Sequence, residues 1–235
     1  MQIHGLNKTT LLDYPEHVAA TVFTGGCNFR CPFCHNVGLV LEPGKQALIS
    51  EEEVLTHLKK RKGLLSGVCI TGGEPTLQPD LPDFLSRIKE LGYLVKLDTN
   101  GYIPEILQML LSEKLLDYVA MDIKASKGNY ARAAGVPELD LTGIQESITL
   151  LQNSGLPYEF RTTVVKGIHT VEEFEEIGKW LAGSRAYYLQ GYRESENVLG
   201  IRNGAVMTAF SKPELEQMAT LAGRYIEKVE LRGVE

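Results

Sequence analysis

The sequence predicts an α/β fold, an incomplete parallel (β/α)6 barrel, and three observations lead to it. Apolar runs rich in branched residues alternate with amphipathic helical patterns along the chain. These runs are nearly continuous, as expected for parallel strands that are buried on both faces. Polar residues gather at the end of each predicted strand, as they do at the rim of an α/β barrel, whereas an open sheet collects its ligands at one switch point.

The predicted strands set the order of the elements. They cover residues 18–26, 67–73, 93–101, 118–126, 158–167 and 186–192, with a short seventh at 228–233. Helices are expected between them, and several have clear start signals. Ser50 and Thr170 are each followed three residues later by Glu, which is the pattern of a capping box, and Pro104 and Ser211 open two further helices.

Composition limits the classes of function. The chain has 235 residues, and we expect one domain that spans residues 1–235. A net charge of −6 argues against nucleic acid as the partner. No apolar run reaches the length of a membrane span, and the N-terminus lacks the apolar segment of a signal peptide. We therefore expect a cytoplasmic protein without membrane contact, in which clustered cysteines indicate metal or redox chemistry.

Three of the four cysteines lie close together after the first predicted strand. Cys27, Cys31 and Cys34 have the spacing C-x3-C-x2-C, whereas Cys69 lies in an apolar strand and is expected to be a buried core thiol. A structural zinc site normally closes with four protein ligands. His35 directly follows Cys34, and neighbouring residues rarely chelate one metal together. The motif therefore predicts a metal centre with three thiolate ligands and one open position.

Further motifs accompany the cysteines. Phe33 precedes the last cysteine, and "GGEP" (72–75) follows the second strand. Together these motifs resemble the radical S-adenosylmethionine (SAM) superfamily, which implies an incomplete barrel of the radical SAM type. More narrowly, "CNFRCPFCHN", "LDTNG" and "MDIKAS" resemble the activating enzymes of glycyl radical enzymes. The long-chain activating proteins of anaerobic ribonucleoside-triphosphate reductase look most similar, including "YYLQGYRES" and "VELRG".

The resemblance implies two cofactors. Cys27, Cys31 and Cys34 would hold three irons of a [4Fe–4S] cluster, and SAM would chelate the fourth iron through its amino and carboxylate groups. An electron passed through the cluster would split the sulfonium and yield a 5′-deoxyadenosyl radical. The electron would come from a donor of the flavodoxin or ferredoxin type.

Residues around the first strands are implied to bind SAM. Gly72 and Gly73 would let the backbone approach the ligand, and Glu74 would accept a hydrogen bond from its amino group. Phe33 would pack near the adenine. The alternative interpretation is a tight turn with a solvated glutamate and an ordinary core phenylalanine.

Residues at later strand ends are implied as well. Asp98 would contact SAM, and together with Thr99 and Asp122 it would form a site for a monovalent cation. Lys124 would offer positive charge to the SAM carboxylate, and Arg161 would reach the same region. The alternatives are a turn at Asp98, an ion pair between Asp122 and Lys124, and a structural ion pair at Arg161.

Three functions stay open at this point. The first is an activase that removes a glycyl Cα hydrogen from a partner glycyl radical enzyme, with anaerobic ribonucleoside-triphosphate reductase as the expected partner. The second is a radical SAM enzyme that acts on a small molecule, similar to carboxy-deazaguanine synthase. The third is a non-catalytic zinc-binding module that uses the three cysteines and His35.

Overall fold

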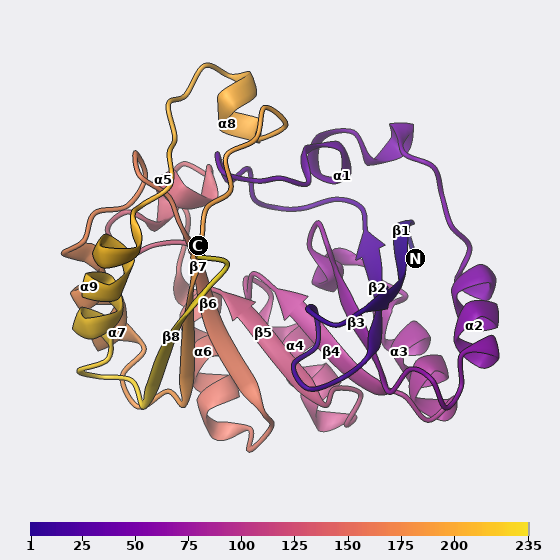
Figure 1. Cartoon of the computed structure of the whole chain (residues 1–235). Helices are drawn as coiled ribbons and strands as arrows, with labels where there is room; N and C mark the ends of the chain where they lie inside the picture. The colour runs from indigo at the N-terminus through magenta and orange to yellow at the C-terminus, as the bar shows by residue number, and fades with distance from the viewer. Residues whose placement is uncertain (235) are drawn as a thin grey trace. The chain divides into compact units, whose positions relative to one another are not determined.

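The computed structural model describes residues 1–234, and its strands form one mostly parallel sheet (Figure 1). The eight strands follow one another in sequence order, from β1 at one edge to β8 at the other, so the sheet is not closed. They are β1 (Ile3–Thr10), β2 (Ala19–Thr24), β3 (Gly67–Gly72), β4 (Leu94–Thr99), β5 (Tyr118–Asp122), β6 (Tyr158–Val164), β7 (Ala186–Gly191) and β8 (Lys228–Arg232). The prediction of an incomplete parallel barrel is therefore confirmed.

Helices connect the successive parallel strands. They are α1 (Val37–Leu41), α2 (Glu51–Lys60), α3 (Leu81–Glu90), α4 (Pro104–Ser112), α5 (Tyr130–Ala134), α6 (Thr142–Asn153), α7 (Glu173–Trp180), α8 (Leu199–Arg202) and α9 (Lys212–Ala222). Two short 3-10 turns are η1 (Pro43–Lys45) and η2 (Pro75–Leu77). No helix within residues 1–234 combines the length and the apolar character that crossing a bilayer requires.

The chain divides into two compact parts. The first part contains Met1–Asn28 and Gly38–Ala120, and the second contains Phe29–Val37 and the chain from Met121 onward. The division falls within the cysteine motif, since Cys27 belongs to the first part and Cys31 and Cys34 to the second. The expectation of one domain over residues 1–235 stays a prediction.

The first part is built on β1 to β4. The parallel register pairs Ala19 with Gly67 and Thr24 with Gly72, so β2 and β3 end side by side. Strand β1 runs antiparallel to β2 and was not predicted. Only Ile3 and Thr10 among its residues are buried, so the strand lacks the apolar pattern by which the others were found. Its backbone ladder with β2 holds it at the edge of the sheet.

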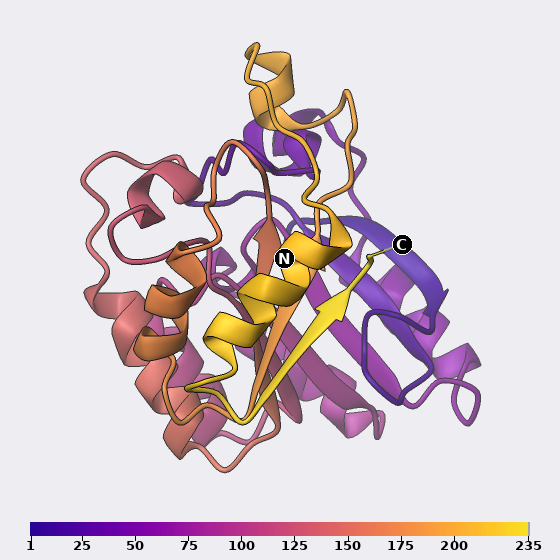
Figure 2. The ribbon, with the colours of Figure 1, turned by 60° about the vertical axis from the view of Figure 1, so that its left-hand side comes forward.

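The second part contains β6 to β8 and the helices beside them. The three strands are parallel, and the register places Gln190 of β7 opposite Arg232 of β8. Helix α9 lies beside β8, as Figure 2 shows. Helices α7 and α9 pack closely because Gly178 has no side chain: a Cβ there would lie 2.9 Å from the Cα of Ala222.

Three of the four predicted helix starts are confirmed. The Ser50 hydroxyl accepts the backbone N–H of Glu53 at 3.1 Å, Ser211 forms a capping box, and Pro104 is the first residue of α4. The start at Thr170 is wrong, because α7 begins at Glu173. One oxygen of the Glu173 carboxylate accepts the backbone N–H of Thr170 at 3.4 Å, and the other accepts the backbone N–H and the hydroxyl of Ser126 at 2.8 and 2.7 Å. The shorter hydrogen bonds of Glu173 are therefore the long-range ones with Ser126.

Candidate active site

The turn after β3 presses against the turn after β2, directly before Cys27. The backbone N–H of Gly73 donates to the carbonyl of Thr24, and that of Glu74 donates to the carbonyl of Gly26, both at 2.8 Å. A Cβ at Gly73 would lie 1.8 Å from the carbonyl oxygen of Gly26. Only glycine permits this approach, so the "GGEP" motif fixes the backbone just before the first cysteine.

Glu74 is buried and joins the ends of β3 and β4. Its side chain accepts hydrogen bonds from the Thr76 backbone and hydroxyl at 3.1 and 2.6 Å, from the Thr99 hydroxyl at 2.7 Å and from the Asn100 backbone at 2.7 Å. Burial raises the pKa of Glu74, and the hydrogen bonds from Thr76, Asn100 and Thr99 oppose that rise. The expected contact between Glu74 and the SAM amino group stays a prediction.

Two asparagines extend this network to the cysteine motif. The backbone N–H of Tyr102 donates to Oδ1 of Asn100 at 3.0 Å, so Nδ2 of Asn100 faces Asn28 and donates to its Oδ1 at 2.7 Å. The Asn28 amide is thereby oriented, and its Nδ2 is buried without a hydrogen-bond partner within residues 1–234. Sγ of Cys27 lies 3.9 Å from Oδ1 of Asn28. The Asn28 side chain therefore lies beside a predicted ligand and has one buried donor that no residue in 1–234 uses.

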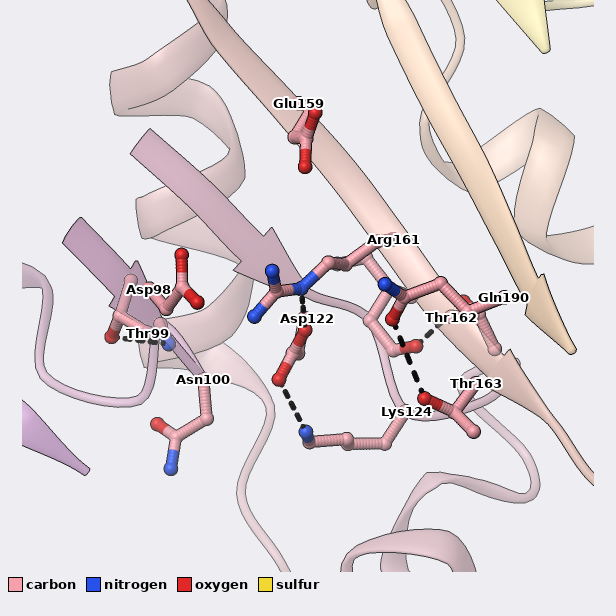
Figure 3. Close-up of polar contacts among 12 residues, drawn as sticks. Asp98, Thr99, Asn100, Asp122, Lys124, Glu159, Arg161, Thr162, Thr163 and Gln190 are labelled. Carbon is pink, nitrogen blue, oxygen red and sulfur yellow. Dashed lines mark hydrogen bonds and ion pairs between the residues drawn. The ribbon is translucent and has the colours of Figure 1, made fainter. Parts of the chain in front are cut away.

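Asp98 is the last residue but one of β4, before Thr99 and Asn100 (Figure 3). It forms an ion pair with Lys96, a residue that is only 2% exposed. Nζ of Lys96 also lies 3.8 Å from Sγ of Cys69, which is completely buried as predicted. The expected contact of Asp98 with SAM is not tested by this geometry. The cation site expected of Asp98, Thr99 and Asp122 would join residues of both parts of the chain, and it also stays a prediction.

In the second part, backbone hydrogen bonds anchor the loop that carries Cys31 and Cys34. The N–H of Gly200 donates to the carbonyl of Pro32 at 2.6 Å, and that of Leu199 donates to the carbonyl of Cys34 at 3.2 Å. Cys31 is buried and Cys34 is half-buried. Burial raises the pKa of the Cys34 thiol, whereas the N–H of Asn36 and the positive charge of Lys124 act in the opposite direction.

Asp122, Lys124 and Arg161 form a compact ion-pair group between the end of β5 and the middle of β6 (Figure 3). Asp122 accepts Nζ of Lys124 at 2.8 Å and Nε of Arg161 at 2.5 Å. Burial alone would raise the pKa of Asp122, but the charges of Arg161 and Lys124 hold it well below its usual range. Burial would lower the pKa of Lys124. The negative charge of Asp122 raises that pKa, and Cys31 adds a smaller contribution in the same direction. Lys124 therefore stays positively charged next to the cysteine loop.

His169 supports this group, although its spacing from other residues did not indicate a role. Its Nε2 donates to the backbone carbonyl of Lys124 at 2.8 Å, and its Nδ1 accepts the N–H of Val165 at 3.0 Å. Burial lowers the pKa of His169, which suits the neutral ring that these two contacts require. Phe33 is buried, and its ring centroid lies 6.0 Å from that of His169. Its expected contact with adenine stays a prediction.

The donor chemistry of the motif fits an iron–sulfur cluster. Three thiols lie within eight residues, Lys124 supplies compensating positive charge, and Asn28 offers a buried donor of the kind that binds cluster sulfur. Within residues 1–234, no three Cys, His, Asp or Glu side chains are already gathered as a metal-binding group. The assignment of Cys27, Cys31 and Cys34 as ligands therefore stays a prediction.

Comparison with known proteins decides the family. The model of the "Radical SAM superfamily" matches residues 21–181, which include the cysteine motif, the "GGEP" turn and the Asp122 group. The chain belongs to the radical SAM superfamily. Its cofactors are accordingly a [4Fe–4S] cluster and SAM, and the chain is an enzyme. The interpretation as a non-catalytic zinc module is wrong.

Two sequence relatives differ in how much of the chain they match. A protein of Methanocaldococcus jannaschii named "Putative glycyl-radical enzyme activating enzyme" is 31% identical over 99% of this chain and 96% of its own length. A protein of Saccharolobus solfataricus named "Probable GTP 3',8-cyclase" is 37% identical over 53% of this chain and 41% of its own. The first similarity runs through the whole chain, and the second only through about half of it.

Solved structures share the fold. SuiB of Streptococcus suis, bound to its precursor peptide SuiA, superposes with a TM-score of 0.68 at 15% identity over 89% of this chain and 48% of SuiB. SuiB has also been solved bound to SAM, with a TM-score of 0.66 to this chain. At this level of identity the likeness shows the fold alone, and the chain spans about half of SuiB.

The Asn28 amide gives the first testable prediction. Once iron binds, the Cys27 thiolate can no longer donate a proton to Oδ1, and we expect it to accept a hydrogen bond from Nδ2. Asn28→Leu should retain the cluster but lower its reduction potential, because hydrogen bonds to sulfur stabilise the more negative reduced state. Potentiometric titration followed by electron paramagnetic resonance measures this. Asn7→Leu, at an exposed position of β1, is the matched control, and equal potentials in both variants would contradict the prediction.

The close contact at Gly73 gives the second testable prediction. Gly73→Ala places a Cβ against the carbonyl of Gly26, and we expect a loss of about 3 kcal/mol in the free energy of unfolding. Gly128→Ala is the control, since a Cβ there meets nothing within 4 Å. Denaturant unfolding of both variants measures the difference. Equal unfolding midpoints for Gly73→Ala and Gly128→Ala would contradict the prediction, because the turns after β2 and β3 could then move apart at no cost in stability.

Proposed function

We propose that this protein is a glycyl-radical-enzyme activating enzyme, which removes a Cα hydrogen atom from a glycine of a partner protein. The similarity to the named activating enzyme of M. jannaschii supports this most directly, because it extends over 99% of this chain and 96% of that protein. The motifs "CHN" and "MDIKAS" favour the same class. Anaerobic ribonucleoside-triphosphate reductase is the partner that we infer from the resemblance of the sequence.

The chain's own residues prepare the reaction in three ways. Cys27, Cys31 and Cys34 would hold the cluster and leave one iron for SAM. When bound, cluster and SAM supply a radical that removes a hydrogen atom, after one-electron reduction by a donor of the flavodoxin or ferredoxin type. Lys124, kept cationic by Asp122, would offset the negative charge of the thiolates and of the SAM carboxylate.

The first part of the chain would position the ligand. The Glu74 network holds Thr99 and Asn100 in place, so the backbone at the ends of β3 and β4 is rigid before any ligand arrives. Gly72 and Gly73 would present backbone groups rather than side chains to SAM. Such prior order matters because a reacting atom that is misplaced by about 1 Å can cost a hundredfold in rate.

A glycine suits this chemistry as a substrate. Its Cα carries no side chain, so a flexible loop could bring the Cα hydrogen into a narrow site. The cluster that we assign is sensitive to oxygen and fits a reducing compartment, and we place the protein in the cytoplasm on that ground.

A small-molecule substrate is the second candidate. The similarity to the S. solfataricus protein, whose name specifies GTP, favours it, although it covers only 53% of this chain. The protein substrate agrees better with the similarity that spans the full length.

Mixing the reduced enzyme, SAM and anaerobic ribonucleotide reductase without oxygen tests the proposal. We expect a doublet signal on the reductase in electron paramagnetic resonance, which narrows when its glycine Cα is deuterated. Replacing Cys27, Cys31 or Cys34 by Ala should abolish it, whereas Cys69→Ala should retain it, because the Cys69 thiol is buried in the core. SAM cleavage with turnover of a small molecule, and no protein radical, would favour the second candidate instead.

A further inference from the structure

Two adjoining hollows lie in the second part, where β6, β7 and β8 end. The smaller has a volume of about 540 Å3, and its walls include His35, Thr163 and Gln190. The larger has a volume of about 670 Å3, and its walls include Phe210 and Lys212. Both hollows are lined by Gly191, Arg193, Glu194 and Gly233. We call this continuous surface the Arg193 groove.

The cations of the groove differ in whether they are paired. The guanidinium of Arg232 donates to both carboxylate oxygens of Glu159, at 2.7 and 2.8 Å, and lies 3.3 Å from the ring centroid of Tyr188. Arg193 and Lys212, in contrast, form no hydrogen bond or ion pair through their side chains with any residue in 1–234. Arg193 is also largely exposed. Its planar donor fork is therefore available to a ligand.

The groove has a surplus of positive charge. Glu194 is its acidic residue, and its carboxylate accepts the backbone N–H of Ala209 at 3.2 Å. Glu159 balances Arg232, so Arg193 and Lys212 against Glu194 leave one positive charge in excess, on a chain whose net charge is −6. This local reversal of sign favours a ligand that carries a carboxylate.

The shape and the polar groups of the groove suit an extended peptide. Gly191 and Gly233 approach closely: a Cβ at Gly191 would lie 2.7 Å from the carbonyl oxygen of Gly233, so no side chain rises from that position. Gln190 accepts the hydroxyl of Thr163 at 3.5 Å through its Oε1 (Figure 3), which leaves its NH2 group to donate to a peptide carbonyl. His35 follows Cys34 directly, so the groove begins next to the cysteine loop in sequence.

We propose that the Arg193 groove binds an extended segment of the partner protein, and that an acidic side chain of this segment pairs with Arg193 and Lys212. This inference rests on the proposed function, because the segment would be the one that carries the target glycine. Arg193 would form a bidentate pair with the carboxylate, Lys212 would add charge, and Gln190 would bind the peptide backbone. The groove thus selects partners by the residue that flanks the glycine.

Peptide binding tests the groove without requiring activity. The probe is a fluorescein-labelled, end-capped peptide Gly-Asp-Gly-Tyr-Gly, added to the anaerobic holoenzyme and followed by anisotropy. We expect the analogue with Asn in place of Asp to bind about tenfold more weakly, since a charge-assisted pair is lost. Arg193→Gln should remove that difference. Arg185→Gln, at an exposed arginine that does not line either hollow, should preserve it.

Three results would overturn the proposal. The first is no measurable binding of either peptide up to millimolar concentration. The second is equal binding of the two peptides, or a preference for Asp that persists in Arg193→Gln. The third is binding of a nucleoside triphosphate that depends on Arg193 and is tighter than that of the peptide, which would assign the groove to a small anion.

A second measurement separates failure of the groove from failure of the proposed function. With the reductase as substrate, Arg193→Glu should require about tenfold more partner for half-maximal glycyl radical, with SAM cleavage in the absence of partner unchanged. The same dependence on partner concentration in wild type and Arg193→Glu would contradict the groove alone. No radical with the wild-type enzyme would instead contradict the proposed function.

Discussion

The buried carboxylate of Glu74 is the interaction on which the first part of the site depends. A carboxylate removed from water is stable only when hydrogen bonds replace its hydration, and Glu74 receives them from Thr76, Thr99 and Asn100. These bonds fix the ends of two strands at once. Asn100 in turn donates a hydrogen bond to Asn28, next to Cys27, and so orients the Asn28 side chain. One buried carboxyl group thereby connects the "GGEP" turn to the cysteine motif.

In the second part, the main electrostatic requirement is a cation that compensates the negative charge of the ligands. Thiolate ligands and a SAM carboxylate bring negative charge, which costs free energy in a half-buried site unless a cation is near. Asp122 keeps Lys124 charged, and His169 fixes the backbone of Lys124. Beyond this group, the Arg193 groove adds positive charge where a partner could dock. Lys124 would then serve the cofactors, and Arg193, a separate cation of the same part, would serve the choice of partner.

The sequence predicted what depends on local pattern and missed what depends on long-range contacts. The parallel strands and three helix starts were found because apolar runs and caps act locally. Strand β1 was missed since backbone pairing, not side-chain burial, holds it. Asn28 and Asn100 were also missed, although both stand inside motifs that had been selected, "CNFRC" and "DTNG". Their roles emerge only when residues 72 positions apart come within hydrogen-bonding distance.

The central claim is that the chain directs a radical to a glycine Cα of another protein. The most direct measurement is isotope transfer: a partner reductase labelled with deuterium at glycine Cα is incubated with the reduced enzyme and SAM, and the 5′-deoxyadenosine is analysed by mass spectrometry. The account predicts one deuterium in that product, in proportion to the glycyl radical formed. Product without deuterium, alongside a normal rate of SAM cleavage, would contradict it.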